Sequence, residues 1–205
     1  MLNYRIIDNM QDVSGQRLAD IISALPQWRQ DIVMRYKFES GRRESALAFR
    51  LLQTMLTDEK LMPADAVRNL EFVIGEHGKP QLNGHSDIHF NLSHCKNAVA
   101  CAVSTEPVGI DVECLGRYSE GVARYSLSEE ELHTLYYDAD GNQRSNDDLQ
   151  LQFTILWTKK ESLLKLLGTG ITDDIKTILP AYADKVSFET TVNTAKQYVC
   201  TVARY

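Results

Sequence analysis

The hydrophobic positions of the first sixty residues recur at helical spacing. Between residues 16 and 37 they repeat every three or four positions, and Pro26 interrupts the run. A clearer helix is predicted after Ser40-Gly41, because apolar residues there recur one turn apart. Its apolar positions are Leu47, Ala48, Leu51, Leu52 and Met55. The N-terminal segment is therefore expected to be helical.

From residue 70 onward the pattern becomes that of strands. Strands are predicted within residues 70–82, 87–94, 97–104 and 108–113. The first segment contains a glycine-rich turn at Glu76 to Pro80. Ile88, Phe90 and Leu92 alternate with polar residues, as in a half-buried strand. The third segment is small and apolar throughout, which favours a strand covered on both faces.

The second half of the chain follows a similar order. Helices are predicted around residues 128–137 and 149–167, and short strands near 186–192 and 197–205. Each half thus combines helices with a small antiparallel sheet. We expect a pseudo-duplicated α+β protein, with an N-terminal half over 1–105 and a C-terminal half over 106–205.

The composition is that of an ordinary globular protein. The 205 residues are 43% hydrophobic and 24% charged, and the net charge of -6 argues against nucleic acid as the main partner. We see no signal peptide and no apolar run long enough to cross a membrane. The cysteines lack CxxC spacing, so reduced thiols in a cytoplasmic protein are expected. They are Cys95, Cys101, Cys114 and Cys200.

Two acidic residues in "VGIDVE" are candidate metal ligands. Asp111 and Glu113 lie two apart on a predicted strand and so share one face, while Ile110 and Val112 point to the core. Neighbouring carboxylates repel unless a cation lies between them, and Mg²⁺ prefers such ligands. The alternative is the solvated outer face of an edge strand, where this spacing is common.

A third acidic residue, Glu131, allows two interpretations. It stands three residues after Ser128, which is the spacing of a helix capping box. It can equally supply a further carboxylate close to the metal.

Several basic and hydroxyl side chains are candidate anion ligands. Ser93 and His94 end a predicted strand, and Lys79 lies in a tight turn. Arg42 and Arg43 stand at the start of a predicted helix, where the backbone already favours anions. Taken singly, each of these charges is more simply a solubilising surface group.

The segment "WTKKESLLK" places three polar or aromatic side chains along one helical stripe. Trp157, Glu161 and Lys165 are spaced four apart. A surface Glu–Lys pair explains the charges but leaves the tryptophan without a role. A glutamate held between an indole and an ammonium can instead serve as a general base.

Together these segments resemble the 4′-phosphopantetheinyl transferases, specifically the broad-substrate Sfp-type class. The signature G-I-D-x-E stands at 109–113 and W-x-x-K-E-x-x-x-K at 157–165. The upstream G-K-P and F-N-x-S-H stand at 78–80 and 90–94. The four motifs occur in the right order and cover about residues 75 to 170.

The resemblance implies an enzyme of the holo-[acyl-carrier-protein] synthase type. Such an enzyme moves the phosphopantetheine arm of coenzyme A, its co-substrate, onto a serine of an apo acyl or peptidyl carrier protein and releases 3′,5′-ADP. It also implies a site between the two halves, a Mg²⁺ cofactor and a protein able to work as a monomer.

The resemblance assigns a role to each candidate residue. Asp111 and Glu113 hold Mg²⁺, with Glu131 as third carboxylate because "LSEEE" is similar to the family's F-S-x-x-E. Glu161 accepts the proton of the carrier serine, and Lys165 neutralises charge on the phosphates. The ligands of coenzyme A are Lys79, Ser93, His94 and Lys165, with Arg42 or Arg43 at the 3′-phosphate.

Two departures and two rival functions remain at this stage. Cys95 stands where the family often has Ser or Thr, and Leu127 replaces the Phe of F-S-x-x-E.

One rival is another Mg²⁺-dependent enzyme acting on a phosphate ester. The other is a non-catalytic module that binds coenzyme A or a carrier protein, in which Glu161 and Lys165 have no use.

Overall fold

The protein is described here from a computed structural model, which defines residues 2–75, 77–170 and 175–205. The elements of the N-terminal half are β1 (Leu2–Ile7), the 3-10 helix η1 (Met10–Asp12), α1 (Gly15–Ser23), α2 (Gln27–Met34), α3 (Glu39–Asp58), α4 (Ala64–Arg68), β2 (Phe72–Ile74), β3 (Pro80–Leu82), β4 (His89–His94) and β5 (Val99–Ser104). Those of the C-terminal half are β6 (Val108–Cys114), α5 (Glu120–Ser126), α6 (Glu129–Tyr136), α7 (Asn146–Leu167), α8 (Ile178–Ala181), β7 (Ser187–Asn193) and β8 (Tyr198–Arg204).

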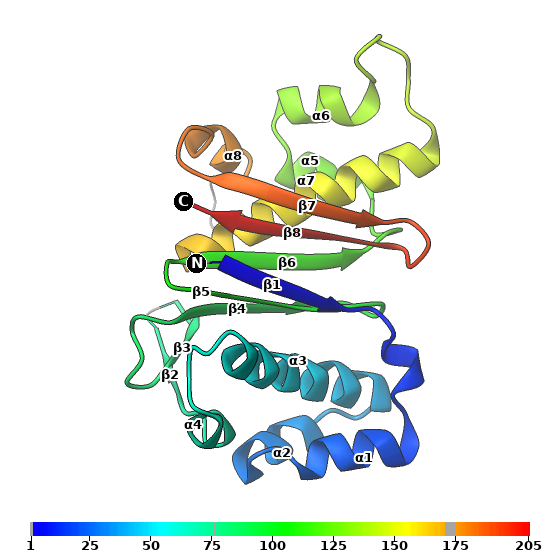
Figure 1. Cartoon of the computed structure of the whole chain (residues 1–205). Coiled ribbons are helices and arrows are strands. Elements are labelled where there is room, and N and C mark those ends of the chain that lie inside the picture. The colour runs from blue at the N-terminus through cyan, green and yellow to red at the C-terminus, as the bar shows by residue number, and fades with distance from the viewer. Residues whose placement is uncertain (1, 76, 171–174) are drawn as a thin grey trace.

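The two halves repeat one sheet topology. Within the described residues, one three-stranded antiparallel sheet has the order β1-β5-β4 and another the order β6-β8-β7 (Figure 1). In both, the first strand of the half pairs with the last, which lies in the centre. This repeat, with helices in each half, confirms the predicted pseudo-duplicated α+β fold. A small β2-β3 hairpin is added to the first half.

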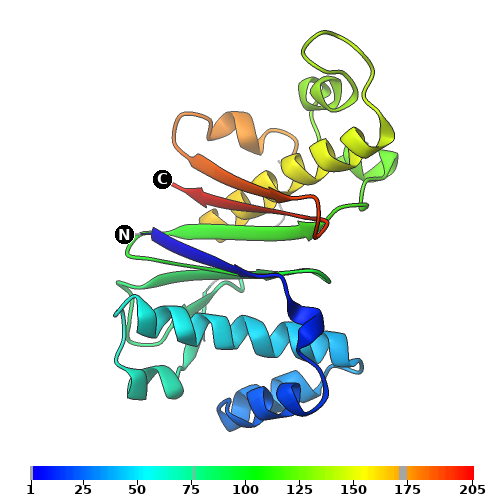
Figure 2. The ribbon, with the colours of Figure 1, turned by 45° about the vertical axis from the view of Figure 1, so that its right-hand side comes forward.

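The two sheets face each other across small side chains. One face of β5 packs on the helices of the N-terminal half through Val99, Cys101 and Val103. Its other face presents Ala100 and Ala102 to the apolar side chains of β6 and β8. Helices therefore lie outside both sheets, as the turned view shows (Figure 2). The predicted strand covered on both faces is confirmed, and small residues on one face let the sheets approach closely.

Some boundaries and elements differ from the sequence prediction. The helix predicted to begin after Gly41 begins at Glu39. Strand β1 was not predicted, and neither were the short helices α4, α5 and α8. In the predicted turn at 76–80, Glu76 lies outside the described residues. The turn between β5 and β6 contains residue 105, and the division of the chain there stays a prediction. No described helix is both long enough and apolar enough to span a bilayer.

Helix α7 crosses β6 at Gly109, the first residue of the G-I-D-x-E segment. A Cβ atom built on Gly109 would lie 1.9 Å from the carbonyl oxygen of Ser162 and 2.5 Å from the backbone nitrogen of Leu166. The two backbones thus touch at a point where only glycine leaves room. This close approach fixes the position of α7, and of its polar side chains, against β6.

Replacing Gly109 with alanine is expected to lower the free energy of unfolding by about 1–3 kcal/mol or more, because backbone atoms have to move to admit the methyl group. Gly121 offers a matched control, since a Cβ atom there meets nothing within 4 Å. Urea unfolding of both alanine variants measures the difference. Equal, small losses of stability would contradict the close approach.

Candidate active site

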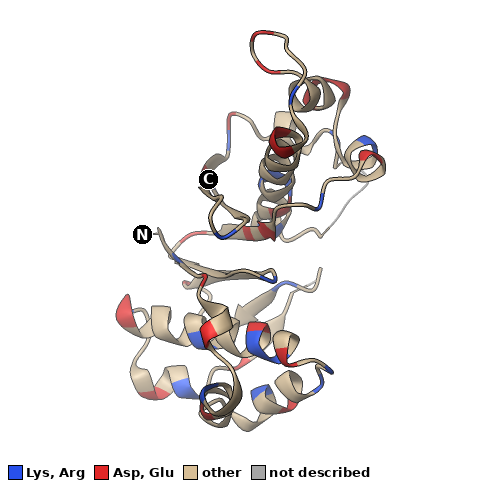
Figure 3. Cartoon of the chain, turned by 90° about the vertical axis from the view of Figure 1, so that its right-hand side faces the viewer, with Lys and Arg blue, Asp and Glu red and all other residues tan. Residues whose placement is uncertain are grey.

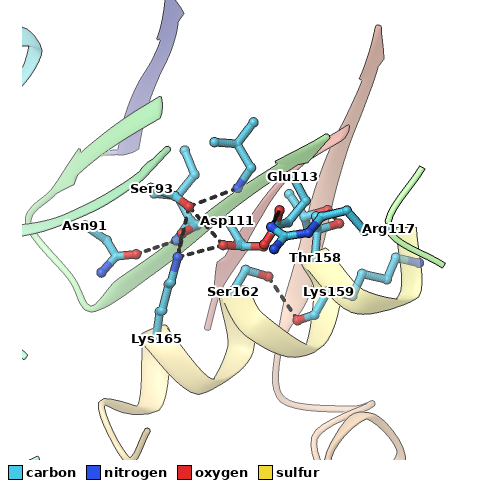
Figure 4. A network of polar contacts seen from close by, with 12 residues as sticks. Asn91, Ser93, Asp111, Glu113, Arg117, Thr158, Lys159, Ser162 and Lys165 are labelled. Atoms are coloured by element: carbon cyan, nitrogen blue, oxygen red, sulfur yellow. Dashed lines mark hydrogen bonds and ion pairs between the residues drawn. The ribbon is translucent and has the colours of Figure 1, made fainter. Parts of the chain in front are cut away.

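Asp111 lies at the centre of a polar cluster between β4, β6 and α7. Its side chain projects from β6, and the residue is only 3% exposed. One carboxylate oxygen, Oδ1, accepts hydrogen bonds from Lys165 Nζ at 2.6 Å and from Ser93 Oγ at 2.9 Å (Figure 4). Lys165 also donates to Ser93 Oγ at 3.0 Å. The solvated-edge alternative for Asp111 is therefore wrong.

Side chains of β4 hold β6 in register beside it. Asn91 Oδ1 accepts a hydrogen bond from the backbone N–H of Ile110 at 2.8 Å, and Ser93 Oγ accepts one from that of Val112 at 3.2 Å. Asn91 and Ser93 lie two apart, so both point toward β6. The two strands run in the same direction at a constant offset. They therefore join the two halves at the cluster.

Glu161 and Lys165 line an open cavity, as their four-residue spacing on α7 predicts. The cavity has a volume of about 350 Å³, and Asn91, Lys79 and Gly168 also line it. Helix α7 ends at Leu167 and is capped by Gly168, whose φ of 72° is left-handed. The structure thus brings the two candidate catalytic side chains to one accessible space.

Electrostatic repulsion links three carboxylates around this cluster. Burial raises the pKa of Glu161, and the charge of Asp111 raises it further. Burial also raises the pKa of Glu113, to which Asp111 adds while Arg117 opposes. Arg117 Nη1 donates to Glu113 at 2.6 Å. Desolvated like charges of this kind favour a bound cation.

The residues present fit a magnesium ion. Within the described chain, the second oxygen of Asp111, Oδ2, is buried and has no hydrogen-bond partner. An orphaned acceptor beside a second repelled carboxylate is the oxygen-rich surrounding that Mg²⁺ takes. No group of three or more His, Cys, Asp or Glu side chains converges among the described residues. Mg²⁺ needs only one or two carboxylates and completes its shell with water and phosphate.

Glu131 is engaged elsewhere. Its Oε2 accepts the backbone N–H of Ser128 at 2.8 Å, and the Ser128 hydroxyl accepts that of Glu131, so the predicted capping box is present. The same oxygen lies 2.8 Å from Nζ of Lys160, which is completely buried. The structure does not bring Glu131 to Asp111 and Glu113. Glu161, in contrast, has a pKa that the charges of both Asp111 and Glu113 help to raise.

Lys79 is a half-buried structural donor in this arrangement. Its Nζ donates to the carbonyl oxygens of Lys165 at 2.6 Å, Val108 at 3.2 Å and Leu166 at 3.4 Å. Burial lowers its pKa to about 8. The ammonium thus satisfies carbonyls at the end of α7 and ties them to the start of β6. Its predicted contact with a phosphate would require it to leave these acceptors.

The strand alternation of β4 separates Ser93 from His94. Ser93 points to Asp111, whereas His94 points to α3, where its Nδ1 lies 3.1 Å from Oε2 of Glu44. Arg43 pairs with Glu39 at 2.9 Å on the same helix. Among the described residues, no arginine is hydrogen-bonded to His94, whose partner is Glu44.

The two candidate arginines also differ in their partners. Arg42 Nε donates to the backbone oxygen of Tyr36 at 2.9 Å. Arg43 donates to Gln11 at 3.3 Å as well as to Glu39. The choice between Arg42 and Arg43 for the 3′-phosphate therefore stays open.

Sequence reasoning missed several residues that organise this region. Asn91, Arg117, Lys160 and Glu44 were not singled out, although each contacts a predicted residue or its strand. Asn91 had a readable signal, because it stands two residues before Ser93. The partners of Lys160 and Glu44 lie on other elements, which spacing alone does not connect, whereas Arg117 follows its partner Glu113 by only four residues.

The family model and the relatives that match this chain all describe 4′-phosphopantetheinyl transferases. Residues 107–203 match the model of the 4′-phosphopantetheinyl transferase superfamily. The 4′-phosphopantetheinyl transferase gsp of Aneurinibacillus migulanus is 34% identical over 143 residues, which are 70% of this chain and 56% of that protein. The transferase Sfp of Bacillus subtilis (strain 168) is 29% identical over 77% of this chain and 65% of its own length. AcpT of Salmonella typhimurium is 31% identical over 48% of this chain and 50% of its own.

The chain spans about half to two thirds of the length of these relatives. The matched region contains Asp111, Glu113, Glu161 and Lys165, so the similarity includes the cluster around α7 and β6. The chain is therefore similar to the 4′-phosphopantetheinyl transferase superfamily over residues 107–203, and to Sfp-type members over 70–77% of its length.

Proposed function

We propose that this protein transfers the 4′-phosphopantetheine arm of coenzyme A to a serine of an apo acyl or peptidyl carrier protein. The observation that supports this most is the placement of Glu161 and Lys165 in one open cavity, beside the buried Asp111 that Lys165 contacts. When a hydroxyl attacks a pyrophosphate, the reaction needs a base, a cation and a metal ion. This region offers a candidate for the base, a candidate for the cation and a pair of candidate metal ligands.

Each reacting atom has a partner in the proposed step. The serine oxygen forms a bond to the β-phosphorus of coenzyme A, and the pyrophosphate bond to the adenosine side breaks, releasing 3′,5′-ADP. Glu161 accepts the serine proton, directly or through water, and its raised pKa suits that role. Lys165 would donate to the phosphate oxygens in exchange for one of its present acceptors, which are Asp111, Ser93 and the carbonyl oxygen of Ile110.

Asp111 and Glu113 would hold the magnesium ion, which supplies charge neutralisation at the pyrophosphate. Ser93 orients Asp111 and Lys165 through its two hydrogen bonds. We revise the role of Lys79 to one of positioning, since it anchors the end of α7 from which Lys165 projects. We assign Glu131 to the ion pair with Lys160 of α7 and not to the metal site.

The proposal includes the cell compartment, the partners and the oligomeric state of the enzyme. All four cysteines, each within the described ranges, are free, which agrees with the reducing cytoplasm where coenzyme A is available. The acidic chain, with a net charge of -6, favours neither nucleic acid nor an anionic membrane as partner. Because both halves of the site come from one chain, we expect a monomer to be active.

The test is chromatographic measurement of 3′,5′-ADP formed from coenzyme A, with and without apo carrier protein and Mg²⁺. We expect release only when both are present, and loss of release on chelation of the metal. A carrier whose acceptor serine is replaced by alanine is the matched control. Release without any carrier would identify a hydrolase of the pyrophosphate bond instead, and the transferase proposal would be abandoned.

A further inference from the structure

Arg117 is placed against the carboxylate of Glu113 by the turn that follows β6. Its Nη1 donates to Oε2 of Glu113 at 2.6 Å, and the close view shows the guanidinium beside that carboxylate (Figure 4). Gly116 precedes the arginine and has a φ of 89°, a left-handed conformation that glycine adopts without strain. The turn at Gly116 therefore brings the arginine back to the strand that it has just left.

The two members of this ion pair are held very differently. The side chain of Glu113 is 17% exposed and projects from β6, which is paired with β8 along its whole length. The side chain of Arg117 is 64% exposed, and among the described residues Glu113 is its one hydrogen-bond partner. An exposed arginine gains little from such a pair, because water readily takes the place of its partner. Arg117 is therefore the member that can leave.

Opposite charges four residues apart are otherwise ordinary in this chain. Figure 3 shows acidic and basic residues interspersed on the helices of the N-terminal half. On α5, Arg124 pairs with Glu120 at 2.8 Å, and their side chains are 64% and 63% exposed. The pair of Arg117 differs from that one because its carboxylate is largely buried and is repelled by a second carboxylate, that of Asp111.

The charges that act on this cluster are nearly balanced without a metal ion. The carboxylates of Asp111, Glu113 and Glu161 repel one another. Lys165 offsets the charge of Glu113 and of Glu161, and Arg117 offsets that of Glu113. Three carboxylates and two cations leave one negative charge in excess. A divalent cation would reverse this excess, and departure of Arg117 would restore neutrality, so the metal ion and the arginine compete for Glu113.

We propose that Arg117 is a positioning residue, a displaceable counter-ion that occupies Glu113 until a divalent cation replaces it, and that it thereby sets the affinity of the site for the metal. The ion belongs to the class that prefers carboxylate and water oxygens, such as Mg²⁺ or Mn²⁺. Glu113 and Arg117 also line a cavity of about 340 Å³ together with Trp157 and Phe153, which gives such an ion access to the carboxylate. This inference rests on the metal site of the proposed function.

The test is a titration with Mn²⁺, in which electron paramagnetic resonance measures the free ion, without coenzyme A or carrier protein. In Arg117→Gln, the Kd for Mn²⁺ should fall about fivefold, because the competing charge is gone. Arg117→Lys keeps that charge and should stay within about twofold of the unchanged protein. Glu113→Gln should raise the Kd about tenfold or more, which shows that the measured ion is the one at this site.

Arg124→Gln is the matched control, since Arg124 has the same exposure as Arg117 and the same spacing from its partner. It removes one positive charge from an ordinary surface pair and should leave the Kd for Mn²⁺ unchanged. An equal fall of the Kd in both glutamine variants would overturn the inference, because it would reflect only the lower net charge.

The direction of the change in Arg117→Gln separates the possible roles of the arginine. A higher Kd would overturn the inference, because Arg117 would then hold Glu113 in place for the metal. An unchanged Kd would also overturn it, and so would a complete lack of Mn²⁺ binding by the unchanged protein. Since no substrate is present, the expected pattern of Kd values supports the inference even if no phosphopantetheine is transferred, in which case only the proposed function fails.

Discussion

Replacing Lys160 with methionine is expected to lower the free energy of unfolding by about 3–5 kcal/mol. Lys160 is fully buried, and its Nζ contacts Glu131 at 2.8 Å and the carbonyl oxygen of Ile175 at 2.7 Å. Burial lowers the pKa of Lys160, and the bond to Glu131 opposes that shift. The ion pair connects α7 to the start of α6 and to the chain that leads into α8.

The loss is large because the side chain of Glu131, the partner of Lys160, is only 11% exposed. Glu131 has a second oxygen, Oε1, that is already buried and without a hydrogen-bond partner in the described part of the protein. Removing the ammonium leaves an uncompensated carboxylate in the interior. The effect should therefore exceed the loss of packing that a lysine-to-methionine change causes.

Urea unfolding of Lys160→Met measures the effect, with the neighbouring Lys159→Met as matched control. Lys159 is half-buried on the same helix, and its replacement should change the stability by about 0.5 kcal/mol or less. Adding Glu131→Gln to Lys160→Met should restore part of the stability, because the stranded charge is removed. Equal effects of the two lysine replacements would show that the buried ion pair is unimportant.

Glu161→Gln is expected to lower kcat for carrier modification by about 10²–10⁴-fold, with little change in KM for coenzyme A. Glutamine keeps the size of the side chain but cannot accept the proton of the serine. The folded protein raises the pKa of Glu161, so it disfavours the ionised form at neutral pH. The variant should therefore be as stable as the unchanged protein or more so.

Steady-state kinetics and thermal unfolding of the same preparations test this pair of expectations. Glu71→Gln is a suitable control, because Glu71 is exposed and hydrogen-bonded to Asn83, away from the cavity. A variant that loses both activity and stability would indicate a structural role for Glu161. Full activity of Glu161→Gln would exclude it as the base.

The fold and the relative placement of the central site residues were largely predictable from local periodicity, whereas their roles were implied only by the resemblance to a family. The alternation of "VGIDVE" predicts that Asp111 shares a face with Glu113, and helical spacing predicts that Glu161 and Lys165 share one cavity. Strand β1 was missed although Leu2, Tyr4 and Ile6 alternate along it. It is a strand because β5 pairs with it, almost 100 residues later in the chain.

The partners of single charged residues were not predictable, because they depend on contacts distant in sequence. Lys79 reads as a turn lysine, yet its acceptors lie on β6 and at the end of α7. The spacing of Glu131 fits both a cap and a metal ligand, and the buried Lys160 favours the first. The spacing of Asp111 fits both a metal ligand and a solvated residue of an edge strand, and its burial beside Lys165 excludes the second. Tertiary packing decides each of these cases.

The most direct test of transfer is the intact mass of an apo carrier protein after incubation with this protein, coenzyme A and Mg²⁺. We expect a carrier heavier by one phosphopantetheine arm, and no such product when Glu161→Gln is used over the same time. A carrier that stays apo across acyl and peptidyl types, while coenzyme A still binds, would contradict the proposed transfer and identify a binding module.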